Sequence, residues 1–200
     1  MLAAVLREHA PGADVLDVCT GSGILASAAG LAGARSVTAV DVSRRAVLAA
    51  RFNGLLNGVR VRGVRGDLLS AVPGEHFDVI VSNPPYMPAV KDDPRGLERA
   101  LEAGHDGRRF VDRLIDAAPE HLRPGGVLLV VHSSVNGIEP SLERLERVGL
   151  EPDVALLHHG PLGPILTARA PMMEDRGLIA PGQREEDVVV VRGRVPVATV

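Results

Sequence analysis

The sequence has few of the residues that build several common kinds of site. It contains one cysteine, Cys19, no tryptophan and one tyrosine, Tyr86. A single cysteine excludes an internal disulfide and a cysteine-rich zinc site, and it suits the reducing cytoplasm, where we expect the protein to act. Because only 2% of the residues are aromatic, few rings are available on which single-stranded nucleic acid could stack.

A basic excess and long apolar runs are also missing. Acidic residues outnumber basic ones by 25 to 22, and the net charge at pH 7 is −3. Proteins that neutralise phosphates need the opposite balance, which weakens the case for a nucleic-acid substrate and leaves it as an alternative. No stretch approaches the roughly 18 apolar residues of a membrane span, and the N-terminus lacks a signal-peptide pattern. We predict no membrane association and, from the spacing of histidine and acidic residues, no metal site.

Short apolar runs rich in β-branched residues alternate along the chain with helical patterns. The chain of 200 residues is 46% hydrophobic, and we expect residues 1–200 to form a single α/β domain. This alternation predicts a doubly wound, mostly parallel sheet with helices on both faces. The predicted strands are Ala13–Cys19, Val37–Val40, Val59–Val64, Phe77–Ser82, Val127–Val131, Pro152–Leu157 and Val188–Val191. The predicted helices are Met1–His9, Ile24–Leu31, Ser43–Asn53, Gly107–Leu122, Ser141–Val148 and a short one within Pro161–Gly182.

Two of these segments have a predicted place relative to the sheet. The strand over Val59–Val64 carries Arg60 and Arg62 on alternate positions, and we place it at an edge because charged side chains discourage pairing with other sheets. The polar, proline-containing segment Met87–Arg99 is expected to be a loop over the site.

The strand predicted over Phe77–Ser82 runs directly into Asn83-Pro84-Pro85-Tyr86. Neither proline has an N–H to donate to a sheet, and each favours an extended backbone in the residue before it, so the strand must end at Asn83. The tetrapeptide presents a carboxamide at the carboxyl end of a strand, backed by a rigid diproline and a tyrosine ring. This arrangement suits hydrogen bonding to a ligand; the competing interpretation is a carboxamide that caps its own turn.

A glycine turn follows the strand over Ala13–Cys19. Gly21-Ser22-Gly23-Ile24-Leu25-Ala26 fits the G-x-G-x-x-A pattern, in which glycine lets a ligand approach the backbone and the helix start offers free N–H groups. Asp41 ends the next strand, 20 residues beyond Gly21, where a carboxylate can accept hydrogen bonds from ribose hydroxyls. A NAD-type cofactor and a tight turn without any ligand both remain alternatives at this point. The residues that fall at predicted strand carboxyl ends, where such sheets bind ligands, are Asp17, Gly21, Gly23, Asp41, Asp67 and Asn83.

Four motifs follow one another in a recognisable order. They are Asp17-Val18-Cys19-Thr20-Gly21-Ser22-Gly23, Ala39-Val40-Asp41, Gly66-Asp67-Leu68-Leu69 and Asn83-Pro84-Pro85-Tyr86. In order and spacing they resemble the class I S-adenosylmethionine-dependent methyltransferases. The nearest likeness is to the HemK/PrmC group, which methylates the glutamine amide nitrogen in the Gly-Gly-Gln motif of peptide-chain release factors. The stretch 103–108 is similar to that group's Gly-x-Asp-Gly segment. The resemblance implies a seven-stranded Rossmann-like sheet and S-adenosylmethionine as cofactor.

The resemblance also implies roles for individual residues. The expected cofactor contacts are Asp17, Thr20, Gly21 and Gly23 around the methionine part, Asp41 and Val42 near the ribose, Asp67 and Leu68 at the adenine, and Asn83 facing the methyl. For catalysis, the Asn83 carboxamide oxygen and the Pro84 carbonyl would accept hydrogen bonds from the acceptor NH2. Tyr86 would pack on the planar amide or base. Because the sulfonium is already activated, such catalysis is mainly positioning.

The sequence departs from the family pattern at two places. Cys19 replaces the first glycine of the usual motif, which we expect to narrow the pocket. The glycine turn comes soon after Met1, so we expect no separate N-terminal substrate-recognition domain of the kind that bacterial release-factor enzymes have. In this respect the chain resembles the compact HemK2/Mtq2-type branch, whose eukaryotic members act with a small zinc-binding partner. If a small activator subunit binds this chain, it would dock on the strand predicted over Val59–Val64. The charges of Arg60 and Arg62 on that strand count against such docking.

The leading hypothesis is therefore a protein glutamine N5-methyltransferase that acts on a release-factor-like protein. One alternative is an N-methyltransferase for an exocyclic amino group of nucleic acid or of a small molecule. Adenine-N6 and guanine-N2 enzymes carry the Asn-Pro-Pro-Tyr motif too. Another alternative is a cofactor-binding accessory protein without catalysis, and a NAD-dependent oxidoreductase is the last competitor.

Overall fold

Seven strands form one sheet in the computed structural model, which describes residues 1–90 and 101–197. The strands are β1 Asp14–Val18, β2 Ser36–Asp41, β3 Val61–Arg65, β4 Phe77–Ser82, β5 Leu122–Ser133, β6 Glu151–Pro161 and β7 Glu185–Arg194. Their order across the sheet is β3-β2-β1-β4-β5-β7-β6. Strand β7 runs antiparallel to both of its neighbours, whereas the other strand pairs are parallel. The predicted doubly wound, mostly parallel sheet of seven strands is confirmed.

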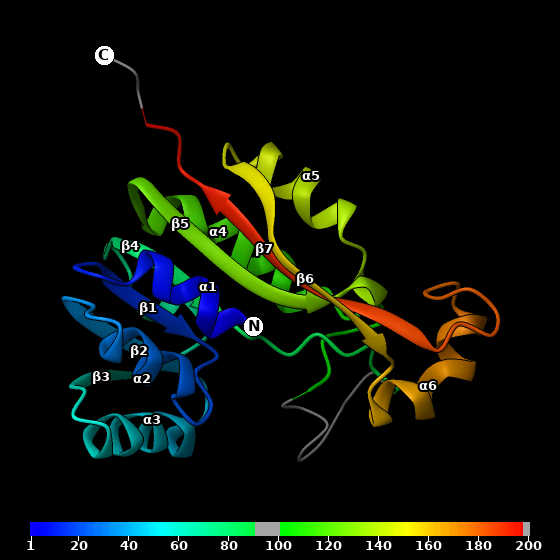
Figure 1. Ribbon diagram of the computed structural model, residues 1–200, viewed down its shortest axis with the longest axis horizontal. Coiled ribbons are helices and arrows are strands. Elements are labelled where there is room, and N and C mark those ends of the chain that lie inside the picture. The colour runs from blue at the N-terminus through cyan, green and yellow to red at the C-terminus, as the bar shows by residue number, and fades with distance from the viewer. Residues whose placement is uncertain (91–100, 198–200) are drawn as a thin grey trace.

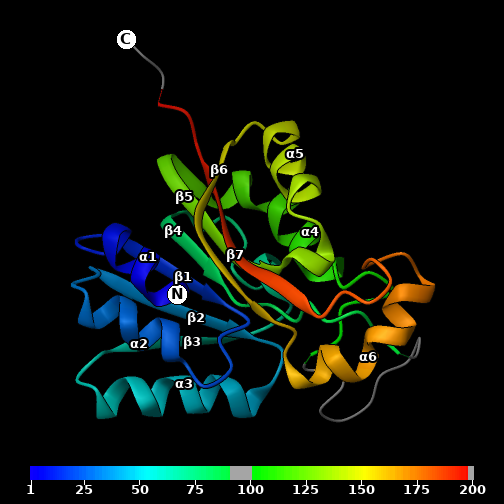
Figure 2. The same cartoon turned by 45° about the vertical axis from the view of Figure 1, so that its right-hand side comes forward.

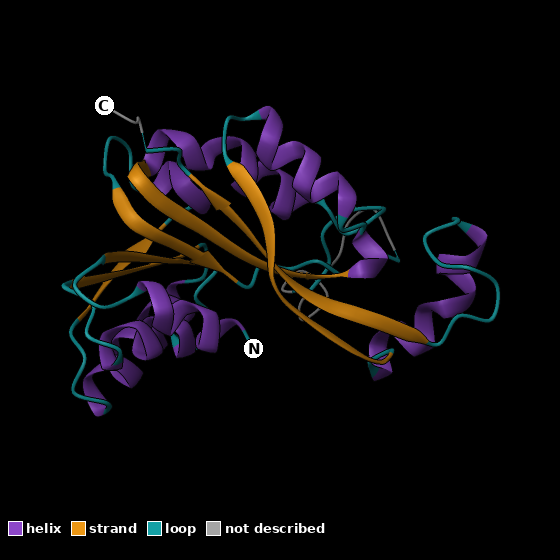
Figure 3. Cartoon of the chain, turned by 45° about the horizontal axis from the view of Figure 1, so that its top comes forward, coloured by secondary structure: helices purple, strands orange, loops and turns teal. Residues whose placement is uncertain are grey.

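Helices cover both faces of this sheet, as predicted. The α-helices are α1 Leu2–His9, α2 Ile24–Leu31, α3 Arg44–Leu56, α4 Arg109–Ala117, α5 Glu139–Arg147 and α6 Pro164–Asp175. Short 3-10 helices are η1 Leu68–Ala71, η3 Ala118–His121 and η4 Ser134–Asn136. Figure 3 shows α1, α2 and α3 on one side of the strands and α4 and α5 on the other. None of the helices in the two described ranges is long and apolar enough to cross a membrane.

The core forms in two layers because successive side chains of a strand point to opposite faces. Val79 and Val81 of β4 belong to the buried cluster that includes α1 and α2. Ile80, between them, belongs to the cluster that includes Leu114 and Ile115 of α4. The central strands are buried on both faces, which explains their continuous apolar sequences.

Some predicted boundaries were wrong for local reasons. The edge strand begins at Val61 instead of Val59, because the Val59 N–H donates to the Gly54 carbonyl, 2.8 Å away, and completes the turn after α3. The helix predicted over Gly107–Leu122 is α4 followed by η3, which has Pro119 in its first turn. Residues 91–99 of the loop predicted over Met87–Arg99 lie outside the described residues.

Helix α6 lies apart from both helical layers. Figures 1 and 2 show it beyond one end of the sheet, where the long antiparallel strands β6 and β7 extend past the other strands. The predicted short helix within Pro161–Gly182 is confirmed, and it accommodates Pro171. Leu166, Ala170 and Met173 of α6 form a small third core with Val135, and Met87 packs against it. The helix is therefore anchored beside the segment that follows Tyr86.

Candidate active site

A cavity of about 1000 Å³ lies at the carboxyl ends of β1, β2 and β4. Its volume is at the upper end of the usual range for small-molecule sites. It contains most of the residues that sequence reasoning proposed for cofactor binding. Those that line it are Thr20, Gly21, Asp41, Val42, Asp67, Leu68 and Asn83. Four others lie outside the lining, namely Asp17, Gly23, Pro84 and Tyr86.

The glycine turn places its two glycines in different surroundings. Gly21 is exposed, has a φ of +53°, and a Cβ there would meet nothing within 4 Å, so its backbone is open to a ligand. Gly23 is buried, and a Cβ there would lie 2.5 Å from the Cα of Ala50. Gly23 therefore allows α2 and α3 to pack closely, while Gly21 faces the cavity. Cys19 has a φ of +58°, the left-handed conformation that favours glycine, which explains why a glycine would be expected at this position.

Asp17 supports this turn from behind. Its Oδ2 accepts hydrogen bonds from the Thr20 hydroxyl, 2.6 Å away, and from the Ala26 N–H, 3.0 Å away. The carboxyl is fully buried, and its Oδ1 has no hydrogen-bond partner in the described part of the chain. Burial raises the pKa of Asp17 to about 7. Asp17 fixes the start of α2, and one of its oxygens is still available to a donor.

Asp41 lines the cavity at the end of β2. Its Oδ2 accepts the Gly21 N–H at 3.0 Å and its Oδ1 accepts the Ser43 N–H at 2.9 Å. A carboxylate has about four lone-pair sites, so each oxygen can accept a further bond. Two backbone groups thus fix the carboxylate in orientation while it remains able to receive two hydroxyl donors.

Asp67, the residue predicted to bind adenine, is already paired with a cation. Arg113 of α4 donates to Asp67 Oδ2 at 2.5 Å and to Oδ1 at 3.3 Å. About half of each side chain is exposed, so water weakens the attraction. Leu68 beside it has a φ of +49°, which is uncommon for a residue other than glycine. Sequence reasoning missed Arg109, Phe110 and Arg113, which line the cavity from α4.

The Asn83-Pro84-Pro85-Tyr86 segment borders the other end of the cavity. Ser82 is buried at the end of β4, and its hydroxyl donates to the Val18 carbonyl at 2.7 Å, which ties β4 to β1. Asn83 is exposed and lines the cavity with Pro85, whereas Pro84 is buried. Tyr86 is half-buried, and burial raises the pKa of its hydroxyl. The strand ends immediately before Asn83, as predicted, and Asn83 lines the cavity.

The residues present fit a nucleoside-containing cofactor with a cationic centre. The cavity brings together an open glycine backbone, the oriented carboxylate of Asp41 and the Asp67–Leu68 corner, with the unpaired Asp17 oxygen behind the turn. No group of three histidine, cysteine or acidic side chains within residues 1–90 and 101–197 is placed to hold a metal ion.

Comparison with known proteins gives a consistent result. Residues 1–148 match the family model described as the methyltransferase small domain. A protein of Methanocaldococcus jannaschii, provisionally named a protein N5-glutamine methyltransferase, is 35% identical over 144 residues, which cover 71% of this chain and 73% of the relative. The release factor glutamine methyltransferase of Deinococcus radiodurans is 43% identical over 128 residues, which cover 58% of this chain and 44% of the relative. The chain therefore spans less than half the length of that enzyme.

A solved structure extends the similarity to almost the whole fold. The E. cuniculi Mtq2–Trm112 complex, described as responsible for methylation of the translation termination factor eRF1, is 26% identical to this chain. The match covers 97% of this chain and 92% of the other, with a TM-score of 0.66. The similarity therefore includes α6 and the antiparallel strand β7, which lie beyond the residues matched by the family model.

Proposed function

Because the chain belongs to the methyltransferase small-domain family, we propose that it transfers a methyl group to the side-chain amide nitrogen of glutamine in a release-factor-like protein. The chain is an S-adenosylmethionine-dependent N-methyltransferase. The observation that carries the choice of a planar NH2 group is Asn83, which lines the cavity at the end of β4 and is followed by two prolines.

S-adenosylmethionine, when bound, supplies a methyl group on a positively charged sulfur that is already activated for transfer. We assign the ribose hydroxyls to Asp41 and the adenine to the Asp67–Leu68 corner. The methionine part is assigned to Thr20 and the glycine turn, which Asp17 holds in place. Val42 lies exposed at the rim and completes the ribose side. With the cofactor held in this way, its methyl group would lie toward Asn83.

The acceptor end holds the nitrogen in line with the bond that breaks. In this proposal the Asn83 carboxamide oxygen and the Pro84 carbonyl each accept one N–H of the acceptor NH2. Tyr86 packs against the plane of the amide, and burial raises the pKa of its hydroxyl further above neutral pH. Orientation can account for a large part of a rate enhancement, which agrees with a site built for hydrogen bonding.

A transfer assay with labelled S-adenosylmethionine tests the proposal. The acceptors are a purified release factor, tRNA, rRNA and DNA, each incubated with the wild-type chain and with Asn83→Ala. We expect label in the release factor with the wild type only. Label that enters only nucleic acid would favour the alternative of a nucleic-acid amino-group methyltransferase, for which binding should also weaken steeply with salt.

Measurements of cofactor binding distinguish two further alternatives. A cofactor-binding accessory protein would bind S-adenosylmethionine tightly and transfer no methyl to any acceptor. A NAD-dependent oxidoreductase would bind NAD in preference, which one calorimetric titration with each cofactor decides. A cytoplasmic location, expected from the lone Cys19, stays a prediction.

A small activator subunit is part of the proposal. Strand β3 is a free edge of the sheet, and beside it α3 exposes the apolar side chains of Leu48, Phe52 and Leu55. Arg62 on this edge is held by Glu75 through two hydrogen bonds of 2.6 Å, so its charge is offset within the chain. These features support a small partner at the position where sequence reasoning placed the docking strand. A candidate subunit should elute with the wild-type chain in gel filtration and separate from Phe52→Asp.

A further inference from the structure

The carbonyl of Tyr86 is held by a buried carboxamide that sequence reasoning did not identify. Asn136, in η4 after β5, donates from Nδ2 to the Tyr86 carbonyl at 2.8 Å and to the Asp106 carbonyl at 2.9 Å. Its Oδ1 accepts the Ser133 N–H at 3.2 Å. Only 4% of Asn136 is exposed, so both N–H groups and the oxygen of the amide are used inside the protein.

Gly107 shows how closely the chain approaches this contact. A Cβ at Gly107 would lie 2.2 Å from the Tyr86 carbonyl oxygen and 2.3 Å from Asn136 Nδ2. Gly107 also has a φ of +78°. Any side chain would push the Gly104–Gly107 segment away from Tyr86. The Gly-x-Asp-Gly resemblance noted in the sequence therefore has a physical basis, which is close approach to the Asn136–Tyr86 contact.

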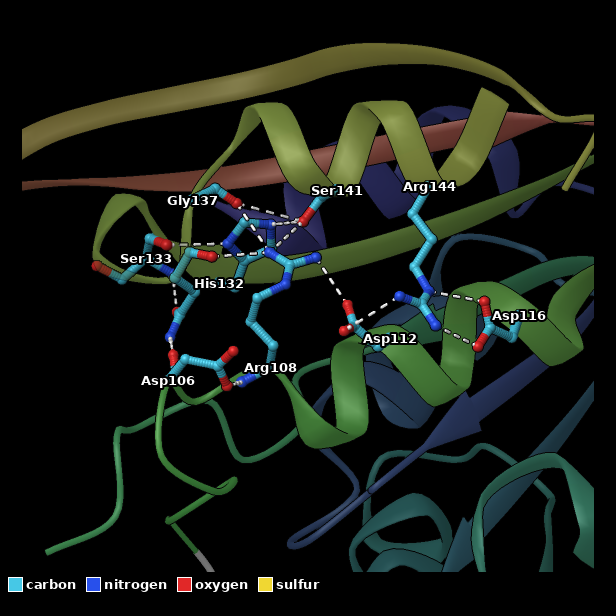
Figure 4. A network of polar contacts seen from close by, with 10 residues as sticks. Asp106, Arg108, Asp112, Asp116, His132, Ser133, Gly137, Ser141 and Arg144 are labelled. Carbon is cyan, nitrogen blue, oxygen red and sulfur yellow. Dashed lines mark hydrogen bonds and ion pairs between the residues drawn. The ribbon is translucent and has the colours of Figure 1, made fainter. Parts of the chain in front are cut away.

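The backbone of Asn136 is fixed by a second set of contacts. Arg108 Nη1 donates to the carbonyls of Asn136 at 2.7 Å and Gly137 at 3.0 Å, and to the Ser141 hydroxyl at 3.1 Å. Figure 4 shows Arg108 lying between Gly137 and Ser141 on one side and Asp112 on the other. The main chain that carries Asn136 is thereby held from α4 and α5.

Buried His132 completes this arrangement. Its Nδ1 lies 2.9 Å from the Ser133 carbonyl, which can only accept, so Nδ1 carries the proton. Its Nε2 then accepts from the Ser141 hydroxyl at 3.0 Å, while the Ser141 oxygen receives Arg108. Burial lowers the pKa of His132 to about 4, which keeps the ring neutral near pH 7.

The segment after Tyr86 is held from α6. Arg169 Nη1 donates to the Pro88 carbonyl at 2.7 Å, and Arg176 Nη1 donates to the Ala89 carbonyl at 2.8 Å. Arg169 also pairs with the buried carboxylate of Glu102 at 2.6 Å. The chain beyond Tyr86 is therefore anchored on α6 and the residue after it, and Asn136 supplies the side-chain hydrogen bond to the Tyr86 carbonyl itself.

We propose that Asn136 is a positioning residue of the methyl-acceptor site. Two prolines separate Tyr86 from Asn83, and their rings fix φ near −65°, so few rotatable backbone bonds lie between the Tyr86 carbonyl and Asn83 to absorb a shift. Asn136 does not line the cofactor cavity, so it acts on the acceptor end alone. The inference rests on the proposed role of Asn83.

Asn136→Asp is the sharpest test, because it keeps the shape of the side chain and replaces the two donors with an oxygen. That oxygen faces the Tyr86 and Asp106 carbonyls, which repel it. At pH 8 we expect kcat to fall on the order of 100-fold, with the dissociation constant of S-adenosylmethionine unchanged. Asn57→Asp, at an exposed asparagine after α3, is the matched control and should behave as the wild type.

A pH profile separates positioning from simple destabilisation. Burial beside two carbonyls raises the pKa of the new carboxyl, and its protonated form restores one O–H donor. The activity of Asn136→Asp relative to the wild type should therefore rise as the pH falls from 8 to about 6. Gly107→Ala, which displaces the same contact from the other side, should lower kcat with unchanged cofactor affinity and without this pH-dependent recovery.

Three results would overturn the inference: wild-type kcat in both variants, a loss of cofactor affinity in step with kcat, or a flat activity ratio across pH. If Asn136→Asp does not fold, Gly107→Ala alone decides by its kcat and cofactor affinity. The rates are measured on whichever acceptor the wild type methylates. Label in RNA alone would refute the glutamine proposal and still decide the role of Asn136.

Discussion

The two ends of the cavity are built in different ways. Around the glycine turn at the cofactor end, the contacts join residues close in sequence: Thr20 and Ala26 bind Asp17 from 3 and 9 residues away, and Gly21 binds Asp41 from 20. At the acceptor end, Asn136 reaches Tyr86 from 50 residues away. Arg169 of α6 and Arg176, the residue directly after α6, hold the following segment from 81 and 87 residues away.

This difference shows that binding the cofactor and orienting the acceptor depend on separate parts of the fold. The glycine turn and Asp41 need only the segments that follow β1 and β2, and the adenine corner adds Asp67 and its pairing with Arg113 of α4. The acceptor end needs β5, α4, α5 and α6 to be in place around one tetrapeptide. Variants at the cofactor end should consequently change the dissociation constant of S-adenosylmethionine, and variants at the acceptor end should change kcat.

The largest effect is expected at Asn83. Asn83→Ala removes the carboxamide that orients the acceptor NH2, and we expect methyl transfer to fall by about 100-fold or more. The S-adenosylmethionine dissociation constant, measured by calorimetry, should change less than about twofold, since one exposed hydrogen-bonding group contributes little to a large cofactor site. Wild-type transfer rates in this variant would remove Asn83 from the mechanism.

Asp41→Ala should produce the opposite pattern. Losing a charged acceptor for two hydroxyl donors costs about 1.5–3 kcal/mol, which weakens cofactor binding by about 10- to 100-fold. With saturating cofactor, kcat should stay close to that of the wild type because the acceptor end is unchanged. A fall in kcat with unchanged affinity would show that the two ends are not separable.

The two ends should also respond to pH with opposite sign. Burial raises the pKa of Asp17 to about 7, so its contribution to stability falls as the pH rises from about 4 to about 7. Burial lowers the pKa of His132 from 6.5 to about 4, so its contribution is lost as the pH falls through that window. Denaturant unfolding of wild type, Asp17→Asn and His132→Gln from pH 4 to 7 measures both slopes. If the unfolding free energy changed with pH in the same way in all three proteins, these assignments would be contradicted.

The smallest effect concerns the departure of Cys19 from the family pattern. Cys19→Gly removes a side chain from a left-handed backbone, and we expect the unfolding free energy to rise by about 0.5–1 kcal/mol. Burial raises the pKa of the Cys19 thiol to about 12, so no charge is lost with it. Gly21→Ala, at a similar φ with open space around it, is the control and should be destabilising. A denaturation midpoint for Cys19→Gly below that of the wild type would show that the cysteine side chain stabilises the turn.

The same division explains what the sequence alone could predict. The sheet, the glycine turn, Asp41 and the strand end at Asn83 could be predicted, because each depends on residue type and on contacts within one strand-turn-helix unit. The positions of Asp17 and Gly23 behind the turn could not be predicted. They depend on the hydrogen bond from the Ala26 N–H to Asp17 and on the close approach of Gly23 to Ala50. The pattern G-x-G-x-x-A is the same whether a glycine faces a ligand or a helix.

The contacts between distant residues were beyond sequence reasoning for a different reason. Asn136 reaches Tyr86 across 50 residues at the acceptor end, and Arg113 reaches Asp67 across 46 residues at the adenine corner; no local pattern marks such pairings. One signal was available: Asn136 follows the carboxyl end of a predicted central strand, as Asn83 does, and polar residues at such ends gather on one edge of the sheet. That rule, applied to β5 as well, would have included Asn136 among the polar residues that follow the strand, together with His132, Ser133 and Ser134.

The central claim is that this chain methylates a glutamine side chain through Asn83. The most direct test is mass spectrometry of a purified release factor after incubation with S-adenosylmethionine and either the wild-type chain or Asn83→Ala, with cofactor affinity measured on the same samples. The account predicts one added methyl group on a glutamine residue with the wild type, none with the variant, and equal cofactor affinity. Methylation of a different residue type, or equal methylation by both proteins, would contradict it.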